Sequence, residues 1–162
     1  DQCFSARNFL VKCLDFDALE DKYMAISLYY RGNVKSKVVQ AVIQWVKTNR
    51  KCTFVEWCPT GFKVGLNERA PAVTKHDDIA PCERHVTMIG NNTFLHRFWR
   101  ERIVKKYDRM YSQRAFVHWY VAEGMEEGEF AEARENLGFL EKDYLDCLSE
   151  QATDEDYEDE DD

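Results

Sequence analysis

The chain has 162 residues, enough for one domain or for one domain with an appendage. Its formal net charge of −8 is local, because residues 154–162 (DEDYEDEDD) hold eight acids and no base, and the rest holds 22 acids and 22 bases. This excludes a uniformly acidic surface, and no apolar run approaches the roughly 18–20 residues that a membrane helix needs. The start, DQCFSARNFLVKC, lacks both the layout of a signal peptide and an initiator methionine, so we expect the chain to begin within a longer protein.

A strand is predicted over residues 22–30, which are rich in aromatic and apolar residues and are followed by Arg31 and Gly32. A helix follows over residues 36–48, with Ser36 as its cap. Its apolar positions recur in steps of three and four: Val38, Val39, Val42, Trp45 and Val46.

Residues 52–57 predict a second strand, and a Pro-Thr-Gly turn at 59–61 leads into extended residues 62–66. Residues 67–84 read as a long loop with two prolines, and residues 85–89 as a short further strand.

Two long helices are predicted next, and one face of each is charged. The first spans residues 92–113 with Asn92 or Thr93 as cap, and its basic face carries Arg97, Arg100, Arg102, Lys105, Lys106 and Arg109. Its apolar stripe comprises Leu95, Trp99, Ile103, Tyr107 and Met110, widened by Phe94 and Phe98.

The second helix spans residues 125–148, after a connecting segment at 116–124, and its other face is acidic. We expect the helices to form an antiparallel pair that opposite charges support and apolar stripes hold. The second stripe comprises Phe130, Ala133, Leu137, Leu140, Tyr144 and Leu148.

The order of elements predicts an α+β or α/β class with a mixed sheet and helices laid on it. We expect a sheet domain over residues 1–91, a helical hairpin over 92–150, and an acidic tail over 151–162 that is too charged to fold.

Several kinds of chemistry lack their usual signals. The phosphate-binding and nucleophile motifs rich in glycine do not occur. The glutamates at 123–135 read better as a solvated stripe than as a catalytic pair, and the neighbouring acidic tail argues against nucleic acid on the basic helix. The scattered histidines and six cysteines match no zinc spacing and favour reduced thiols in a cytosolic protein, with disulfides or zinc as alternatives.

Three segments resemble alpha-tubulin. Residues 54–66 (FVEWCPTGFKVGL) and 114–134 (RAFVHWYVAEGMEEGEFAEAR) are close to the alpha-tubulin sequence, and EKDY at 141–144 with the acid-rich end completes the pattern. The turn Cys-Pro-Thr-Gly at 58–61 and the length of the loop at 67–84 indicate the alpha form. The chain is therefore similar to the carboxyl-terminal portion of a divergent alpha-tubulin.

The resemblance implies a fold: a mixed sheet of the tubulin C-terminal type with a flanking helix, then an antiparallel helical hairpin and a disordered acidic tail. It also implies a structural role in microtubules, in the cytoplasm and cytoskeleton. It places GTP, Mg²⁺ and the catalytic glutamate of the parent chain upstream of residue 1. We therefore expect these residues to hold no cofactor or metal site and no enzyme activity.

The partners implied are beta-tubulin, other tubulin dimers, and motor and microtubule-associated proteins, with neither nucleic acid nor membrane. The helix at 36–48 and residues 57–66 would contact the next dimer, and residues 116–120 the partner within the dimer. Taken alone, the aromatic run at 116–120 is either core or interface. The expected beta-tubulin contacts are Trp57, Pro59, Thr60, Gly61, Phe62, Val64, Phe116, His118 and Trp119.

The outer surface would meet motors. Its expected carboxylates are Glu123, Glu126, Glu127, Glu129 and Glu132, with tail glutamates Glu155, Glu158 and Glu160 available for polyglutamylation. Because the sequence ends in aspartate, we expect no cycle of removal and re-ligation of a terminal tyrosine. We also expect the basic helix face to weaken motor binding.

The first long helix departs from the alpha-tubulin pattern by one extra residue between Trp99 and Asp108. One residue rotates everything beyond it by about 100°, so we expect a π-bulge or a repacked stripe there. Two other functions compete with the filament subunit: a stand-alone adaptor or decoy that binds motors without polymerising, and part of a GTPase.

Overall fold

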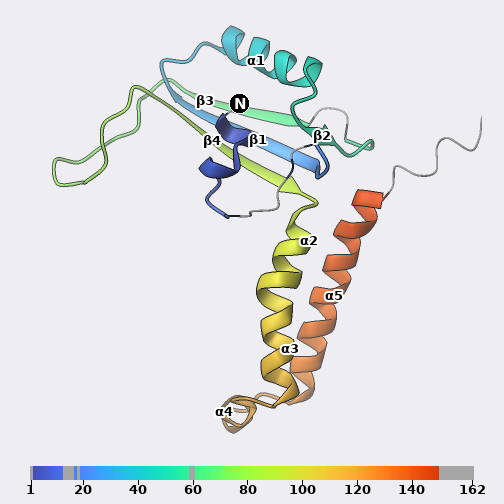
Figure 1. The fold of residues 1–162 in the computed structure, drawn as a ribbon. Helices are drawn as coiled ribbons and strands as arrows, with labels where there is room; N and C mark the ends of the chain where they lie inside the picture. The colour runs from blue at the N-terminus through green and yellow to red at the C-terminus, as the bar shows by residue number, and fades with distance from the viewer. Residues whose placement is uncertain (1, 13–16, 18, 59–60, 150–162) are drawn as a thin grey trace, which may run out of the picture. The chain divides into compact units, whose positions relative to one another are not determined.

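The computed structural model describes residues 2–12, 17, 19–58 and 61–149, and the chain divides into two compact units (Figure 1). The first unit runs to Asn92 and the second begins at Thr93. Within the described ranges, no helix is both long enough and apolar enough to cross a membrane.

The first unit is built on a mixed sheet around β1 (Lys22–Gly32). Its first residues pair in parallel with β2 (Thr53–Phe54), and Ile26 to Arg31 pair in parallel with β3 (Phe62–Asn67). β4 (Arg84–Asn92) runs antiparallel to β1 over its whole length. The predicted mixed sheet with a flanking helix is confirmed.

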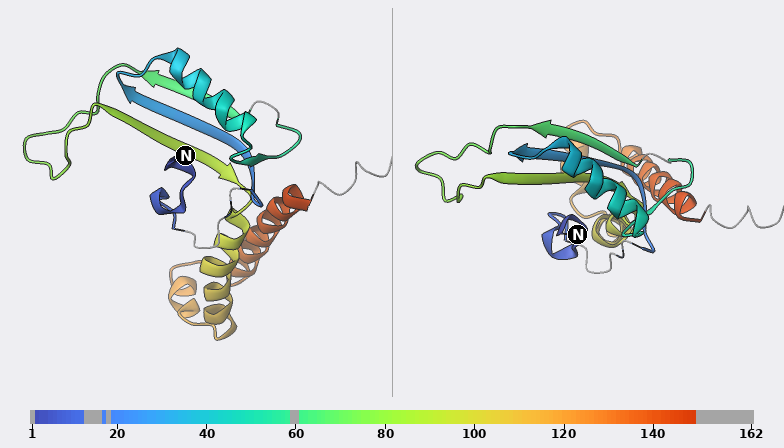
Figure 2. Two further views of the ribbon diagram at one scale, coloured as in Figure 1. Left: turned by 45° about the horizontal axis from the view of Figure 1, so that its top comes forward. Right: turned by 90° about the horizontal axis from the view of Figure 1, so that it is seen from above.

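Helix α1 (Ser36–Thr48) covers one face of this sheet (Figure 2). Val46 on α1 packs with Ile26 and Leu28 of β1 in the core, which also holds Tyr23 and Cys52. Alternation along β1 explains why Ile26 and Leu28 share a face, since every second side chain of a strand points to the same face, and Tyr23 lies beyond the register shift between Tyr23 and Ala25.

The amino-terminal segment forms two single turns, η1 (Gln2–Phe4) and η2 (Ala6–Asn8). The Phe4 ring meets the Tyr23 ring edge-on, with centroids 6.0 Å apart, which ties this segment to the core. Residues 68–83 form no helix or strand, as predicted for the long loop.

Two predictions for this unit are wrong in detail. β2 has two residues instead of six, because the chain turns after Val55 and the Cys58 N–H donates to the Val55 carbonyl. The cap of α1 is Lys35 and not Ser36, since the N–H groups of Val38 and Val39 both donate to the Lys35 carbonyl.

The second unit is an antiparallel helical hairpin (Figure 1). One arm joins α2 (Leu95–Phe98), η3 (Trp99–Val104) and α3 (Lys105–Ser112), and the other arm is α5 (Gly128–Ser149). The tip between them contains α4 (Val117–Ala122), a helix inside the segment predicted only as a connection. The Trp99 ring meets Tyr144 at 4.7 Å, and further along, Tyr111 stacks on Phe130 at 5.5 Å. These pairs confirm the predicted antiparallel arrangement.

The predicted π-bulge is also confirmed, because η3 is a π-helical segment of six residues. It absorbs the extra residue by widening the helix locally. As a consequence the apolar stripe after Trp99 changes at two positions, while Tyr107 stays on the side toward α5: Val104 is buried, whereas Ile103 is 42% exposed. Met110 is likewise exposed, and Tyr111 contacts α5 in its place.

The predicted starts of both arms are wrong by three residues, whereas their predicted last residues are within one residue of the observed ones. Neither Asn92 nor Thr93 caps α2, which follows Phe94 and has no side-chain cap; Asn92 is the last residue of β4. α5 starts at Gly128 instead of Met125. On α5, Ala133 and Leu140 are exposed, although the predicted stripe includes them.

The ion pair that joins α3 to α5 has the polarity opposite to the predicted one, whereas Arg114 and Glu127 at the tip pair with the predicted polarity. Arg134 on α5 donates two hydrogen bonds to Asp108 on α3, at 2.8 and 3.3 Å. This pair places the base on α5 and the acid on α3, the reverse of the expected arrangement. The basic positions of α3 lie on its exposed side, so the aromatic and apolar contacts carry most of the adhesion.

Candidate partner-binding surfaces

The tip of the hairpin exposes a group of aromatic side chains. Arg114 and Phe116 adopt left-handed backbone conformations, with φ of 52° and 62°, which turn the chain sharply into α4. Val117 is buried and anchors α4, while Trp119 is 60% exposed. We call the exposed group the tip patch, and it consists of Phe116, His118, Trp119, Tyr120 and Val121.

The rings of the tip patch are ordered among themselves. The Phe116 and Trp119 centroids are 4.6 Å apart, and His118 meets Trp119 edge-on at 5.7 Å. Large aromatic groups that stay exposed and preorganised suit interface anchors. Of the two alternatives left open for this run, core or interface, the exposure favours an interface.

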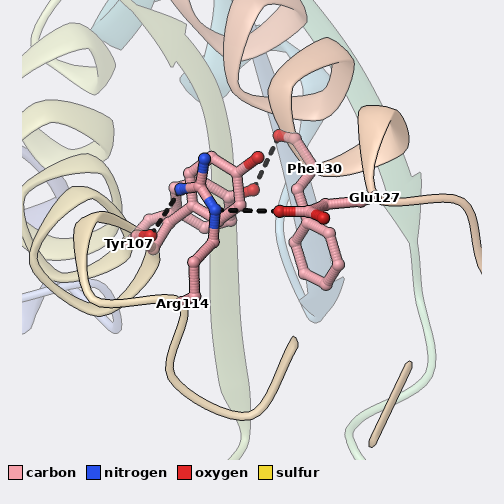
Figure 3. Close-up of polar contacts among 5 residues, drawn as sticks. Tyr107, Arg114, Glu127 and Phe130 are labelled. Carbon is pink, nitrogen blue, oxygen red and sulfur yellow. Dashed lines mark hydrogen bonds and ion pairs between the residues drawn. The ribbon is translucent and has the colours of Figure 1, made fainter. Parts of the chain in front are cut away.

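Arg114 holds the base of the tip patch in place (Figure 3). Its guanidinium lies over the Tyr111 ring at 4.0 Å, and its Nε donates to the Glu127 carboxylate at 2.9 Å. One terminal nitrogen also donates to the Tyr111 carbonyl at 2.8 Å. Arg114 therefore connects the end of α3 with the residues that precede α5.

Phe130 provides the apolar side of the same junction. Its ring stacks on Tyr111 and lies perpendicular to the ring of Tyr120, with centroids 5.5 Å apart in each pair. The Tyr107 hydroxyl donates to the Phe130 carbonyl at 2.6 Å, as Figure 3 shows. Burial, followed by the nearby Tyr111 and Asp108, raises the pKa of Tyr107, so this hydroxyl keeps its proton and remains a donor.

The five predicted motor-facing carboxylates are all exposed: Glu123, Glu126, Glu127, Glu129 and Glu132. Three of them precede α5, and Glu129 is in its first turn, where a negative charge also stabilises the helix dipole. Glu127 differs from the rest because Arg114 already pairs with it. A cationic partner would have to compete with Arg114 for this carboxylate.

The predicted contacts on the sheet unit fall into two groups. Trp57 and Val64 are exposed, at 59% and 42% of their surface. Gly61 is buried and Phe62 packs on the core, edge-on to Phe54 at 5.3 Å. Gly61 and Phe62 therefore stabilise the sheet unit, and the exposed predicted contacts are Trp57 and Val64.

Gly61 has a conformational reason to be glycine. Its φ is +48°, and a Cβ there would lie 2.5 Å from the Phe54 ring. The Gly61 carbonyl also accepts a hydrogen bond from the Ile26 N–H at 2.8 Å. The turn into β3 thus depends on the absence of a side chain.

Sequence reasoning missed that only part of the apolar stripe of α1 is buried. Val39 and Val46 are buried, but Val38, Val42 and Trp45 are exposed along the flank beside them. At about 100° per residue, the five positions 38, 39, 42, 45 and 46 span about 120° of the helix surface, so they form one stripe that is wider than its buried part. The helix therefore carries an exposed apolar flank next to the face on the sheet.

The family model of the tubulin C-terminal domain matches residues 1–104. The chain belongs to the tubulin family. The match covers the whole sheet unit and ends with Val104, the last residue of the π-helical segment. Membership indicates a microtubule-related role with tubulin or microtubule partners and a cytoskeletal location.

Some predicted positions of this tubulin-family chain lie outside the described residues. These are Pro59 and Thr60 in the turn, and the tail glutamates Glu155, Glu158 and Glu160. Among the described residues, no group of three or more histidine, cysteine or carboxylate side chains could hold a metal ion.

Proposed function

We propose that this chain is an alpha-type tubulin portion that makes longitudinal contacts with beta-tubulin and presents a charged outer surface to motors. The observation that carries the proposal is the tip patch, an exposed and preorganised aromatic cluster in a segment close to alpha-tubulin. Exposed Trp57 and the exposed apolar flank of α1 support a second contact area on the sheet unit.

The chemistry of the two surfaces differs in a way that suits two kinds of partner. Trp119 and Phe116 offer apolar area, which fits a protein interface with a desolvated centre. Glu123, Glu126 and Glu129 offer exposed carboxylates, which fit a basic partner held by long-range attraction. We assign beta-tubulin to the tip patch and motors to the carboxylates.

GTP and Mg²⁺ belong, in this proposal, to residues that precede the chain in its parent protein. These 162 residues then contribute contacts and no hydrolytic chemistry.

The decisive experiment captures beta-tubulin from a co-expressed mixture on the tagged full chain. Trp119→Ala should lower the captured amount about tenfold or more, the size expected for an aromatic interface anchor. Ile79→Ala is the matched control, because Ile79 is an apolar residue 70% exposed in the loop at 68–83, outside both contact areas. Circular dichroism of both variants checks that the fold is retained.

Two outcomes would overturn the proposal. Equal capture by the wild-type chain and Trp119→Ala would remove the tip patch from the interface. Capture of motors without any capture of beta-tubulin would favour the adaptor or decoy instead.

A further inference from the structure

The outer side of the first hairpin arm carries three basic residues on one face. Arg102, Lys106 and Arg109 are spaced by four and then three positions, the spacing of neighbours on a helix surface. All three are exposed, whereas Val104, Tyr107 and Tyr111 occupy the side toward α5. We call the three residues the basic ridge.

The acids nearest the basic ridge are already engaged. Glu101 pairs with Lys105 on the same arm, and Asp108 pairs with Arg134 on α5. Within the described part of the chain, no carboxylate forms an ion pair with Lys106 or Arg109. Like charges at such spacing destabilise a helix slightly, so an anionic partner on the ridge would relieve repulsion.

The same chain supplies a strongly anionic stretch. Residues 154–162 contain eight carboxylates and no base, and we call them the acidic segment. Arginine side chains bind carboxylates with two parallel hydrogen bonds, which makes two arginines and a lysine a suitable receptor.

The path from α5 to the basic ridge is short enough. Tyr144 lies against Trp99, so Ser149 ends α5 at the same end of the hairpin as α2. Measured along the hairpin axis, Arg102 lies roughly 10 Å from the level of Ser149, and a helix with its side chains is about 10–12 Å in diameter. The 13 residues after Ser149 can span up to about 43 Å. The acidic segment can therefore pass around the arm and lie along the ridge.

We propose that the acidic segment binds the basic ridge of its own chain. The contact is made by ion pairs between Arg102, Lys106 and Arg109 and some of the eight carboxylates. Most of the carboxylates remain free, so the segment stays anionic but presents fewer charges to cationic partners. This inference does not depend on assembly with beta-tubulin.

Zero-length coupling of amines to carboxylates tests the contact in the full chain at low concentration. A carbodiimide should join the Lys106 amine to carboxylates at 154–162, identified by fragment mass spectra. The Lys105–Glu101 pair provides an internal positive control, since both groups stay in place in every variant. Raising the salt to 1 M, where the screening length falls from about 8 Å to about 3 Å, should abolish the product of Lys106.

Variants that keep Lys106 separate the proposed contact from chance proximity. Arg102→Gln with Arg109→Gln should lower the Lys106 product about fivefold, because two of the three ion pairs are lost. Arg69→Gln with Arg84→Gln removes the same charge from exposed positions of the sheet unit and should leave the product unchanged. A Lys106 product that is absent, or that both double variants lower equally, would overturn the proposal.

A mixture of ¹⁴N- and ¹⁵N-labelled chains decides whether the contact is within one molecule. Products that join only like isotopes are expected. Products that join light to heavy chains in equal number would assign the ridge to the acidic segment of a second copy and refute the contact proposed here.

Discussion

Arg114 at the base of the tip patch offers the sharpest test of how the hairpin tip is held. Arg114→Gln removes the charge and the planar guanidinium but keeps a side chain of similar length. The variant loses three contacts seen in the structure: the ion pair with Glu127, the stacking on Tyr111 and the hydrogen bond to the Tyr111 carbonyl.

The expected cost follows from the exposure of these groups. The side chains of Arg114 and Glu127 are 53% and 56% exposed, so their ion pair contributes about 0.2–1 kcal/mol. The stacked cation contributes about 0.5–1 kcal/mol at such a site, and the hydrogen bond about 0.5–1.5 kcal/mol. The free energy that closes the tip should therefore fall by roughly 1–3 kcal/mol.

Hydrogen exchange followed by mass spectrometry measures this loss directly. Peptides that cover residues 115–127 should exchange about 5- to 150-fold faster in Arg114→Gln. Arg100→Gln, an exposed arginine on the same arm, is the control and should change stability by less than about 0.5 kcal/mol. In a double-mutant cycle, Glu127→Gln should show a coupling to Arg114→Gln of about 0.2–1 kcal/mol. Unchanged exchange at 115–127 in a folded Arg114→Gln variant would refute the assigned role of Arg114.

Two further predictions concern the sheet unit. Gly61→Ala should lower the free energy of unfolding by at least about 2 kcal/mol, since a left-handed alanine costs about 1–2 kcal/mol and its Cβ would meet the Phe54 ring. Gly128→Ala, where nothing lies within 4 Å of the added Cβ, should be neutral or slightly stabilising in the same urea titration. Burial raises the pKa of Cys52 from 9.0 to about 11. The unfolded chain therefore loses this proton first as the pH rises, and stability should fall between pH 9 and 11 by up to roughly 1.4 kcal/mol per pH unit. Urea titrations across this range should show a shallower fall for Cys52→Ala, and an unaltered slope would contradict the buried thiol as its source.

Local pattern was enough to predict most of the elements. The apolar run at 22–30 and the alternation at 62–66 fix strands whose side chains fit a half-buried sheet, and both strands occur. The one-residue excess after Trp99 predicts the π-helical segment. A helix whose apolar side must face the same partner before and after an extra residue has to accommodate that residue locally. Element ends were predicted less well: the caps at Ser36 and Asn92 follow residue preference, while the chain uses backbone contacts at Lys35 and Phe94.

The faces of the helices could not be assigned from periodicity alone. The five apolar positions on α1 form one stripe about 120° wide, and only contact with Ile26 and Leu28 decides that the part with Val46 faces the sheet. The same holds for the tip patch, where aromatic residues at 116–120 suit a core as well as an interface until their exposure is known. Ion-pair partners are harder still to predict from the sequence, because exposed ion pairs contribute little free energy and do not determine which residues meet.

The sequence by itself determined the tubulin family, the order of strands and helices, the antiparallel hairpin and the position of the π-helical segment. Each of these depends on local periodicity or on long matched segments, which can be recognised without knowledge of the packing. Only the tertiary structure decided that Arg114 engages Glu127, that Asp108 meets Arg134, and that the apolar flank of α1 and the tip patch stay exposed. These features depend on contacts between residues far apart in the chain, and the physical reason is that burial and pairing are properties of neighbours in space.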